Sequence, residues 1–200
     1  MGEGNTHKTA QEKLWAGEFG KDYVARKKGE KLLSSNLAFF SRFLRQMRGA
    51  SSCVEFGANI GMNLKALRLL YPHMDVHGIE INGKAAKELS QSIGSENVTL
   101  GSILEVDPPK CDLALIKGVL IHMIPDVLGS VYEKMVNCTR RYLLVAEYYN
   151  PSLVTVKYRG QDDSLFKRDF AGEIMNRYPV MALVDYGFVY CRDPAFPGTT

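Results

Sequence analysis

Apolar runs of strand length alternate with helix-periodic segments through the middle of the chain. The expected strands lie near residues 53–56, 75–81, 97–100, 112–117 and 142–148. The expected helices between them lie near residues 62–70, 83–93 and 126–138. Because strands that alternate with helices form a parallel sheet covered on both faces, this pattern predicts an α/β fold.

The two ends of the chain depart from this alternation. Apolar residues recur at helical spacing from Lys31 to Met47, so we expect residues 1–49 to form a helical cap. Residues 164–178 predict a helix, and residues 181–191 predict a terminal antiparallel hairpin with a tight turn at Tyr186-Gly187. No repeat or linker divides the sequence. We therefore expect one domain over residues 1–200, with residues 50–200 as its core.

Composition limits the class of protein. With 46% hydrophobic and 24% charged residues, the 200-residue chain can form a globular domain with a sizeable core. The four cysteines are scattered, without a Cys-x-x-Cys pair, which favours a reducing compartment and hence the cytoplasm. No apolar stretch approaches the roughly 20 residues of a membrane span, and the start is unlike a signal peptide. We therefore expect no membrane partner.

The formal net charge of +3 is too small to indicate nucleic-acid binding. Basic residues gather at 21–31 and again at Arg42, Arg45 and Arg48, where a solvated helix face is the ordinary interpretation. Neither aromatic platforms nor a recognisable nucleic-acid-binding module accompanies them. We therefore expect no nucleic-acid partner. The sequence leaves open whether the protein is a monomer or a homodimer.

A glycine turn follows the first expected strand. Gly57 and Gly61 allow the backbone to turn tightly and approach a ligand, and the helix that follows offers free N–H groups at its amino end. Glu80 ends the next expected strand, at the spacing of an acid that binds ribose hydroxyls. Together these features predict a nucleotide-cofactor site.

Two residues distinguish this turn from dinucleotide-binding turns. Asn59 stands where a dehydrogenase has its middle glycine, and Glu55 precedes Gly57. A pyrophosphate needs bare N–H groups, whereas a buried carboxylate suits a positively charged ligand such as S-adenosylmethionine. A nicotinamide-dependent oxidoreductase is a weaker alternative, because the only Tyr-x-x-x-Lys pattern, Tyr23 to Lys27, precedes the glycine turn.

The order of elements, the segment E-F-G-A-N-I-G at 55–61, Glu80 and the terminal hairpin resemble class I S-adenosylmethionine-dependent methyltransferases over residues 50–193. More narrowly, the chain resembles the pseudaminic acid biosynthesis-associated methylase family. The motifs are W-A-G-E-F-G at 15–20, E-F-G-A-N-I-G-M-N at 55–63, K-G-V-L-I-H at 117–122, Y-N-P at 149–151, Y-R-G at 158–160 and K-R-D-F-A-G-E at 167–173. The resemblance implies a Rossmann-like, mostly parallel seven-stranded sheet with a C-terminal antiparallel hairpin and an N-terminal helical cap.

The resemblance to the class also implies S-adenosylmethionine as the cofactor and a role for each matching residue. The methionine and ribose part would be lined by Gly57, Ala58, Asn59 and Gly61, and Glu80 would bind the ribose hydroxyls. Ser102 and Ile103 would flank the adenine together with Ile81, although both isoleucines fit plain core packing equally well. The expected site also includes Lys117, Gly118, Trp15 and Tyr23. The two aromatic residues would form a lid, although a helix docked on the sheet would use them in the same way.

His122 follows the fourth expected strand and is the candidate catalytic base. Histidine ordinarily titrates near a pKa of about 6.5, which suits removal of a hydroxyl proton, and a structural histidine that caps a helix is the competing interpretation. The strand end lacks the Asn/Asp-Pro-Pro-aromatic signature of enzymes that methylate DNA bases and amides, because Pro108-Pro109 comes too early. No histidine and acid pair has metal-ligand spacing, so no metal is expected.

Aromatic and charged residues gather after the fifth expected strand, and they form the expected substrate site. They are Tyr148, Tyr149, Tyr158, Arg159, Lys167 and Arg168. Aromatic faces and cationic groups suit a polyhydroxylated or anionic substrate, and a solvated loop with local ion pairs is the alternative. The sequence thus favours O-methylation of a small hydroxylated or carboxylated metabolite, such as a nonulosonic-type sugar. A non-catalytic S-adenosylmethionine-binding protein is the alternative function.

Overall fold

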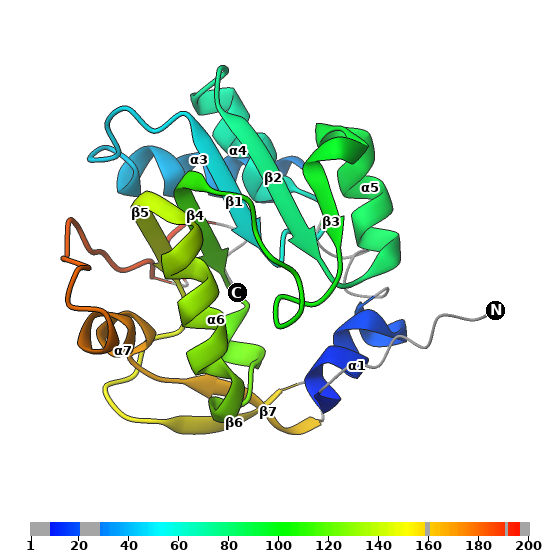
Figure 1. Ribbon diagram of the computed structural model, residues 1–200, viewed down its shortest axis with the longest axis vertical. Coiled ribbons are helices and arrows are strands. Elements are labelled where there is room, and N and C mark those ends of the chain that lie inside the picture. Colours follow the sequence, from blue (N-terminus) through cyan, green and yellow to red (C-terminus); the bar gives the residue numbers. More distant parts are fainter. Residues whose placement is uncertain (1–8, 21–28, 159–160, 191, 197–200) are drawn as a thin grey trace.

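The computed structural model describes residues 9–20, 29–158, 161–190 and 192–196. Its centre is a five-stranded parallel sheet in the order β3-β2-β1-β4-β5 (Figure 1). The strands are β1 (Ser52–Phe56), β2 (Asp75–Glu80), β3 (Val98–Leu100), β4 (Cys111–Lys117) and β5 (Thr139–Ala146). The strand order reverses between β1 and β4, and a parallel sheet has its ligand crevice at the carboxyl ends of the strands beside such a reversal.

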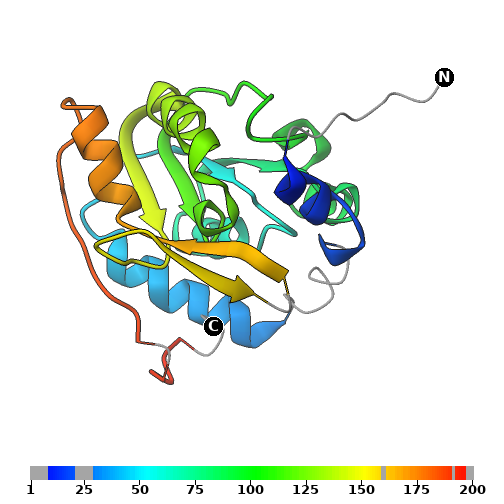
Figure 2. The same cartoon turned by 90° about the horizontal axis from the view of Figure 1, so that it is seen from below.

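Helices cover both faces of this sheet. α3 (Glu30–Phe43), α4 (Met62–Leu70) and α5 (Gly83–Ile93) lie on one face, and α6 (Pro125–Cys138) and α7 (Phe170–Arg177) lie on the other (Figures 1 and 2). Successive side chains of a strand point to opposite faces. Leu113 and Leu115 of β4 therefore pack in the α3–α4–α5 cluster, whereas Ala114 and Ile116 pack in the α6–α7 cluster.

Two further elements lie beyond the carboxyl ends of the strands. One is α1 (Ala10–Ala16), and the other is an antiparallel pair, β6 (Val154–Tyr158) and β7 (Gln161–Lys167) (Figure 1). β7 contacts η2, the short 3-10 helix Leu120–His122 that follows β4, and Leu165 packs with Leu120 and Ile121. The end of the sheet that holds the candidate site is therefore covered by segments from both ends of the chain.

The expected seven-stranded sheet is wrong, because β6 and β7 form a separate sheet that packs across the carboxyl edge. The expected helix 164–178 is wrong at its start, since residues 161–167 are a strand and α7 begins only at Phe170. Asp169 accepts a hydrogen bond from Gly172 N at 2.8 Å and thereby caps the amino end of α7.

The expected terminal hairpin is also wrong within residues 181–190, which have no strand pairing, while residue 191 lies outside the described residues. Several large apolar side chains of this stretch stay exposed, including Tyr186 at 84% and Phe188 at 74%. Strand-forming residue types indicate that a segment suits a sheet, but a strand also requires a neighbouring strand to pair with.

The remaining expected helices and strands of residues 52–138 are confirmed. α3 ends at Phe43, four residues before the expected boundary at Met47. The apolar pattern extended too far because Leu44 and Met47 also pack in the apolar cluster, although they lie after the helix. β5 begins three residues before the expected start, at Thr139. Among the described residues, each helix is too short or too polar to pass through a membrane.

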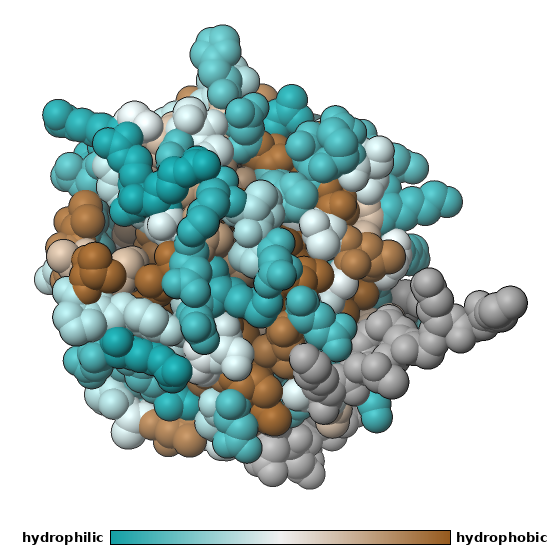
Figure 3. Space-filling view, in the orientation of Figure 1, coloured by the Kyte–Doolittle hydropathy of each residue, from teal (hydrophilic) through white to brown (hydrophobic). Residues whose placement is uncertain are grey.

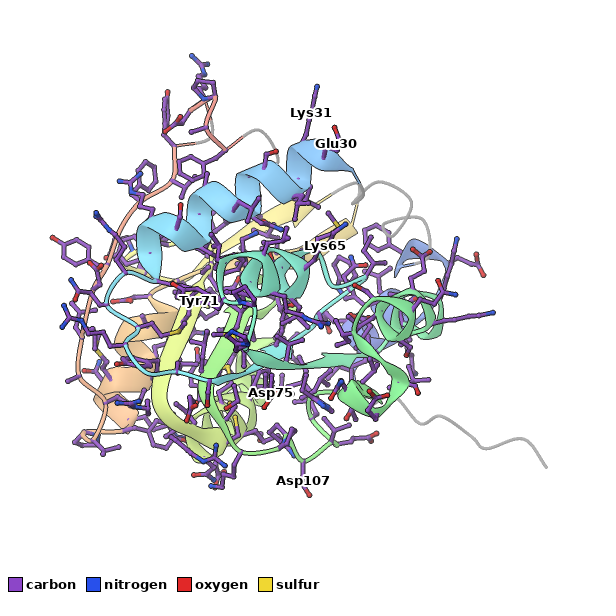
Figure 4. The ribbon with its side chains drawn as sticks, turned by 90° about the horizontal axis from the view of Figure 1, so that it is seen from above. Glu30, Lys31, Lys65, Tyr71, Asp75 and Asp107 are labelled. Carbon is purple, nitrogen blue, oxygen red and sulfur yellow. The ribbon has the colours of Figure 1, made fainter. Side chains whose placement is uncertain are left out.

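Charged side chains cover much of the outer surface. Glu30 and Lys31 project outward from the amino end of α3, as Figure 4 shows from the side of the amino ends of the strands. Figure 3 shows hydrophilic side chains over much of the upper part of the molecule, where these amino ends lie. Arg42, Arg45 and Arg48 are exposed, in keeping with a solvated face.

Candidate functional site

The turn after β1 is built from residues with positive φ angles. Gly57 has φ 75°, Asn59 has φ 49° and Gly61 has φ 82°. Asparagine is among the few non-glycine residues that tolerate this left-handed region. Gly57 is also required by space, because a Cβ atom there would lie 2.6 Å from a methyl carbon of Val119. The N–H groups of Gly57 and Ala58 donate to Ile79 O, so the turn is fixed to β2.

Glu80 at the end of β2 receives hydrogen bonds from this turn. Its Oε2 accepts from Asn59 N and its Oε1 accepts from Asn82 N, both at 2.7 Å. Burial raises the pKa of Glu80, and these backbone donors oppose that rise. Each carboxylate oxygen has a second lone pair, so Glu80 can still accept hydrogen bonds from a ligand.

A second buried carboxylate, Glu55, lies at the end of β1. Its side chain is 1% exposed, and Asn63 Nδ2 on α4 donates to its Oε1. Burial raises the pKa of Glu55 to about 8, against the opposing effects of the Asn63 hydrogen bond and the Lys117 charge. Glu55 Oε2, Asn59 Oδ1 and Asn63 Oδ1 are buried acceptors without a hydrogen-bond partner among the described residues. Unpartnered acceptors of this kind fit a ligand that brings N–H or O–H groups or positive charge.

Lys117 ends β4 and brings a positive charge to the same edge of the sheet. Its Nζ lies 3.4 Å from Asn36 Oδ1 and 5.6 Å from the centroid of the Phe39 ring, both on α3. Gly118 follows with φ 68° and turns the chain into η2. A cation and two carboxylates thus lie at the carboxyl ends of three neighbouring strands.

The segment after β3 carries Ser102 and Ile103. The Ser102 hydroxyl donates to the carboxylate of Glu12 on α1, and Ser102 Oγ accepts from Leu104 N at 3.0 Å. Glu12 is buried and was not among the residues expected from the sequence. The Thr9-x-x-Glu12 spacing could have marked it, because Thr9 and Glu12 form a capping box at the start of α1.

α1 is attached to the sheet through Asn82. The Asn82 amide Nδ2 donates to Trp15 O at 2.9 Å, and Ala16 O and Gly17 O lie at 3.4 Å. Its Oδ1 accepts from Lys84 N and Ala85 N and caps the amino end of α5. One side chain therefore satisfies the last carbonyls of α1 and the first N–H groups of α5.

His122 is the last residue of η2 and is buried. Its backbone N–H donates to Val119 O at 2.9 Å, and its ring centroid lies 4.8 Å from that of Trp15. Trp15 also contacts Phe19 edge to face at 5.2 Å. The candidate base and the candidate lid residue are therefore in contact.

These groups surround one cavity of about 210 Å³. The residues of the expected site that line it are Trp15, Gly57, Ala58, Asn59, Glu80, Ile81, Ser102, Ile103, Lys117, Gly118 and His122. Further lining residues that sequence reasoning missed include Glu12, Asn36, Asn63 and Asn82. Gly61 caps α4 at the end of the turn, and Tyr23 lies outside the described residues.

The expected substrate residues lie elsewhere. Tyr148 and Tyr149 are 41% and 68% exposed, and Lys167 Nζ lies 5.6 Å from the centroid of the Tyr148 ring. Arg168 Nε forms an ion pair with Glu173, which also accepts from Tyr132 Oη at 2.8 Å. Neither Lys167 nor Arg168 lines the cavity.

Two other expected substrate residues have no described side chain. Tyr158 belongs to β6 but only its backbone is described, and Arg159 lies outside the described residues. Within the described part of the chain, no three or more His, Cys, Asp or Glu side chains are grouped as metal ligands would be.

No family model matches the chain, and no curated protein matches it. Solved structures do. The mitomycin 7-O-methyltransferase MmcR has a TM-score of 0.64 and 15% identity over 84% of this chain and 54% of its own. The sugar N-methyltransferase KedS8 from Streptoalloteichus sp. has a TM-score of 0.55 and 16% identity over 80% of this chain and 67% of its own.

An O-methyltransferase of a trans-AT PKS multienzyme from Brevibacillus brevis, in complex with S-adenosyl-L-homocysteine, has a TM-score of 0.53 and 13% identity over 80% of this chain. This chain spans about half the length of MmcR and of the Brevibacillus enzyme, 54% and 55% respectively. At these identities the likeness concerns the fold. The chain has the Rossmann-like fold of class I S-adenosylmethionine-dependent methyltransferases.

Proposed function

We propose that this protein binds S-adenosylmethionine in the cavity at the carboxyl edge of the sheet and methylates an oxygen atom of a small acceptor. The observation that carries the proposal is that the Gly57–Gly61 turn, the Glu80 carboxylate and the His122 imidazole line the same cavity. Both O- and N-methyltransferases have this fold, so the fold leaves the acceptor atom open.

The lining residues fit the parts of the cofactor. Glu80 accepts hydrogen bonds from the ribose hydroxyls, because its two oxygens are held in place by Asn59 and Asn82. Ile81 and Ile103 provide apolar contacts for the adenine ring. Lys117 binds the carboxylate of the amino-acid arm, and the unpartnered Oδ1 of Asn63, which also lines the cavity, accepts a hydrogen bond from the ammonium group.

When bound, S-adenosylmethionine supplies an electrophilic methyl group on a sulfonium sulfur. His122 accepts the proton of the acceptor hydroxyl through a ring nitrogen, so that the oxygen can form its bond to the methyl carbon. Its burial against Trp15 limits access of water to that proton transfer. An acceptor carboxylate is already ionised and needs no base.

The acceptor we propose is a polyhydroxylated acid, such as a nonulosonic-type sugar. The motifs that resemble the pseudaminic acid biosynthesis-associated methylase family support this class, and so do the exposed Tyr148 and Tyr149 and the cationic Lys167 near the carboxyl edge. Arg159 and Arg168 remain proposed anion contacts. Arg168 would have to share its guanidinium between the substrate and Glu173.

Two measurements test the proposal. Calorimetry with S-adenosylmethionine and S-adenosylhomocysteine should detect binding of each. Incubation with methyl-labelled cofactor and a panel of sugar acids, nucleotide sugars and small carboxylic acids should transfer label to a member of the panel, as read by mass spectrometry. Failure to bind either nucleoside would refute the proposal. Binding without transfer to any acceptor would favour a non-catalytic cofactor-binding protein.

A Glu80→Gln variant tests the assigned cofactor site. Loss of one charged acceptor for the ribose hydroxyls should raise the Kd for S-adenosylhomocysteine by about tenfold or more. Glu96→Gln is the matched control, because Glu96 is an exposed carboxylate before β3, at the opposite edge of the sheet. The Kd of this variant for S-adenosylhomocysteine should equal that of the wild type. Equal affinities of all three proteins would place the nucleoside elsewhere.

A further inference from the structure

Glu147 is a half-buried residue whose carboxyl oxygen Oε2 is buried, and it lies outside the cavity but contacts the segment that carries His122. It follows the last residue of β5, and its Oε1 accepts hydrogen bonds from Val119 N and Leu120 N, both at 3.0 Å. Glu147 does not line the cavity, so it does not contact a ligand there. Its effect on a reaction would be exerted through the segment that it binds.

That segment has few hydrogen bonds of its own. η2 is only three residues long, and the His122 N–H to Val119 O bond closes its turn. The first N–H groups of a helix have no partner within the helix, and in a turn this short they need an external acceptor. Glu147 supplies that acceptor for two successive N–H groups. A buried N–H group left without a partner destabilises the conformation that buries it.

The surroundings of Glu147 explain how one carboxyl can hold this turn. Gly118 N donates to Ala146 O at 3.0 Å, so β4 and β5 remain bonded up to the residue before Glu147. Burial raises the pKa of Glu147 to about 7, and the Val119 and Leu120 N–H groups and the Lys117 charge oppose this rise. Oε1 can accept hydrogen bonds whether or not Oε2 is protonated.

We propose that Glu147 is a positioning residue for methyl transfer, which fixes the start of η2 and thereby the place of the His122 imidazole in the cavity. This inference rests on the proposed function for its catalytic consequence. Its structural part, the dependence of the His122–Trp15 contact on Glu147, holds independently of the proposed function.

The experiment compares Glu147→Ala and Glu147→Gln with the wild type. Glutamine retains a carbonyl oxygen that can accept from Val119 N and Leu120 N, whereas alanine retains none. Glu147→Ala should lower kcat by about tenfold or more with the Kd for S-adenosylhomocysteine changed less than about threefold, and Glu147→Gln should restore most of kcat. Asp112→Asn is the matched control, because Asp112 also accepts a backbone N–H, from Ser51, but at the opposite edge of the sheet.

A second readout does not depend on turnover. Trp15 is the only tryptophan, and its ring contacts that of His122, so loss of this contact should change Trp15 fluorescence emission at a fixed pH. Glu147→Ala should change this emission, and Glu147→Gln should preserve it. A folded Glu147→Ala protein with the wild-type kcat and emission would overturn the inference, and so would a Glu147→Gln protein as impaired as Glu147→Ala. If the wild type transfers no methyl group, the proposed function fails and the fluorescence emission still decides the positioning role.

Discussion

At the residue scale, His122 joins the sheet to the N-terminal cap, because its backbone belongs to η2 and its ring contacts Trp15 of α1. Replacing His122 by alanine should lower methyl transfer to a hydroxyl by about 100-fold or more, since general-base assistance of that size is lost. Cofactor affinity should change little, because Glu80 and the glycine turn remain. Single-turnover kinetics and calorimetry measure the two quantities.

His73→Ala is the matched control, since His73 is exposed after α4 and lies at the amino edge of the sheet. Its turnover should equal that of the wild type. If His122→Ala also retained full turnover with a hydroxyl acceptor, another base would have to act. Full turnover restricted to carboxylate acceptors would identify methyl ester formation, which needs no base.

Single residues also limit what the sequence could predict about the site. The glycine turn follows β1, Glu80 ends β2 and His122 lies five residues after β4, so their place at the carboxyl edge follows from the strand pattern alone. Glu12 and Asn82 could not be found in this way. Glu12 contacts Ser102, which is 90 residues away in the sequence, and Asn82 contacts Trp15, which is 67 residues away. Only the folded chain reveals these contacts.

At the element scale, α1 is held over the cavity by the Asn82 amide, and a change at this one side chain should release it. Asn82→Ser keeps a good cap for α5, because serine and asparagine cap helices about equally well, but it removes the Nδ2 donor to Trp15 O. We expect weaker S-adenosylhomocysteine binding and a shift of Trp15 emission to longer wavelength, because α1 carries three of the cavity-lining residues, Gln11, Glu12 and Trp15.

Asn82→Ala separates this effect from loss of the helix cap. It removes both the donor and the cap, so its free energy of unfolding should fall by about 1 kcal/mol more than that of Asn82→Ser. The two variants should show similar Trp15 emission. Unchanged emission and affinity in Asn82→Ser would mean that the Glu12–Ser102 contact alone suffices to dock α1.

Strands were predictable from the sequence where helices pack on both of their faces, because both faces then require apolar residues. β1, β2 and β4 are buried between helical layers, so their apolar runs ended close to the true strand ends. β5 is at the edge of the sheet, where polar residues are tolerated, and Arg140 and Arg141 concealed its first half. Residues 181–190 have strand-forming composition but no strand beside them, which a propensity argument cannot detect.

At the scale of the whole molecule, two buried carboxyls should make stability depend on pH. Burial raises the pKa of Glu55 to about 8 and that of Glu147 to about 7, whereas in the unfolded chain each titrates near 4.5. Between these limits the folded protein binds more protons than the unfolded chain, so raising the pH favours unfolding. The stability linked to these groups is fully present below about pH 4.5 and is lost as the pH rises through 7 and 8.

Urea unfolding across this range measures the effect, and the wild type should have a lower free energy of unfolding at about pH 9 than at about pH 6. Glu55→Gln should remove the decline between about pH 7 and 8 and make it less steep between about pH 4.5 and 7, where Glu147 still contributes, since the amide still accepts from Asn63 Nδ2 and carries no charge to bury. At about pH 9 this variant should therefore be more stable than the wild type. A decline of the same size and position in both proteins would show that Glu55 is already ionised in the folded state at neutral pH, and that the Lys117 charge and the Asn63 amide outweigh its burial.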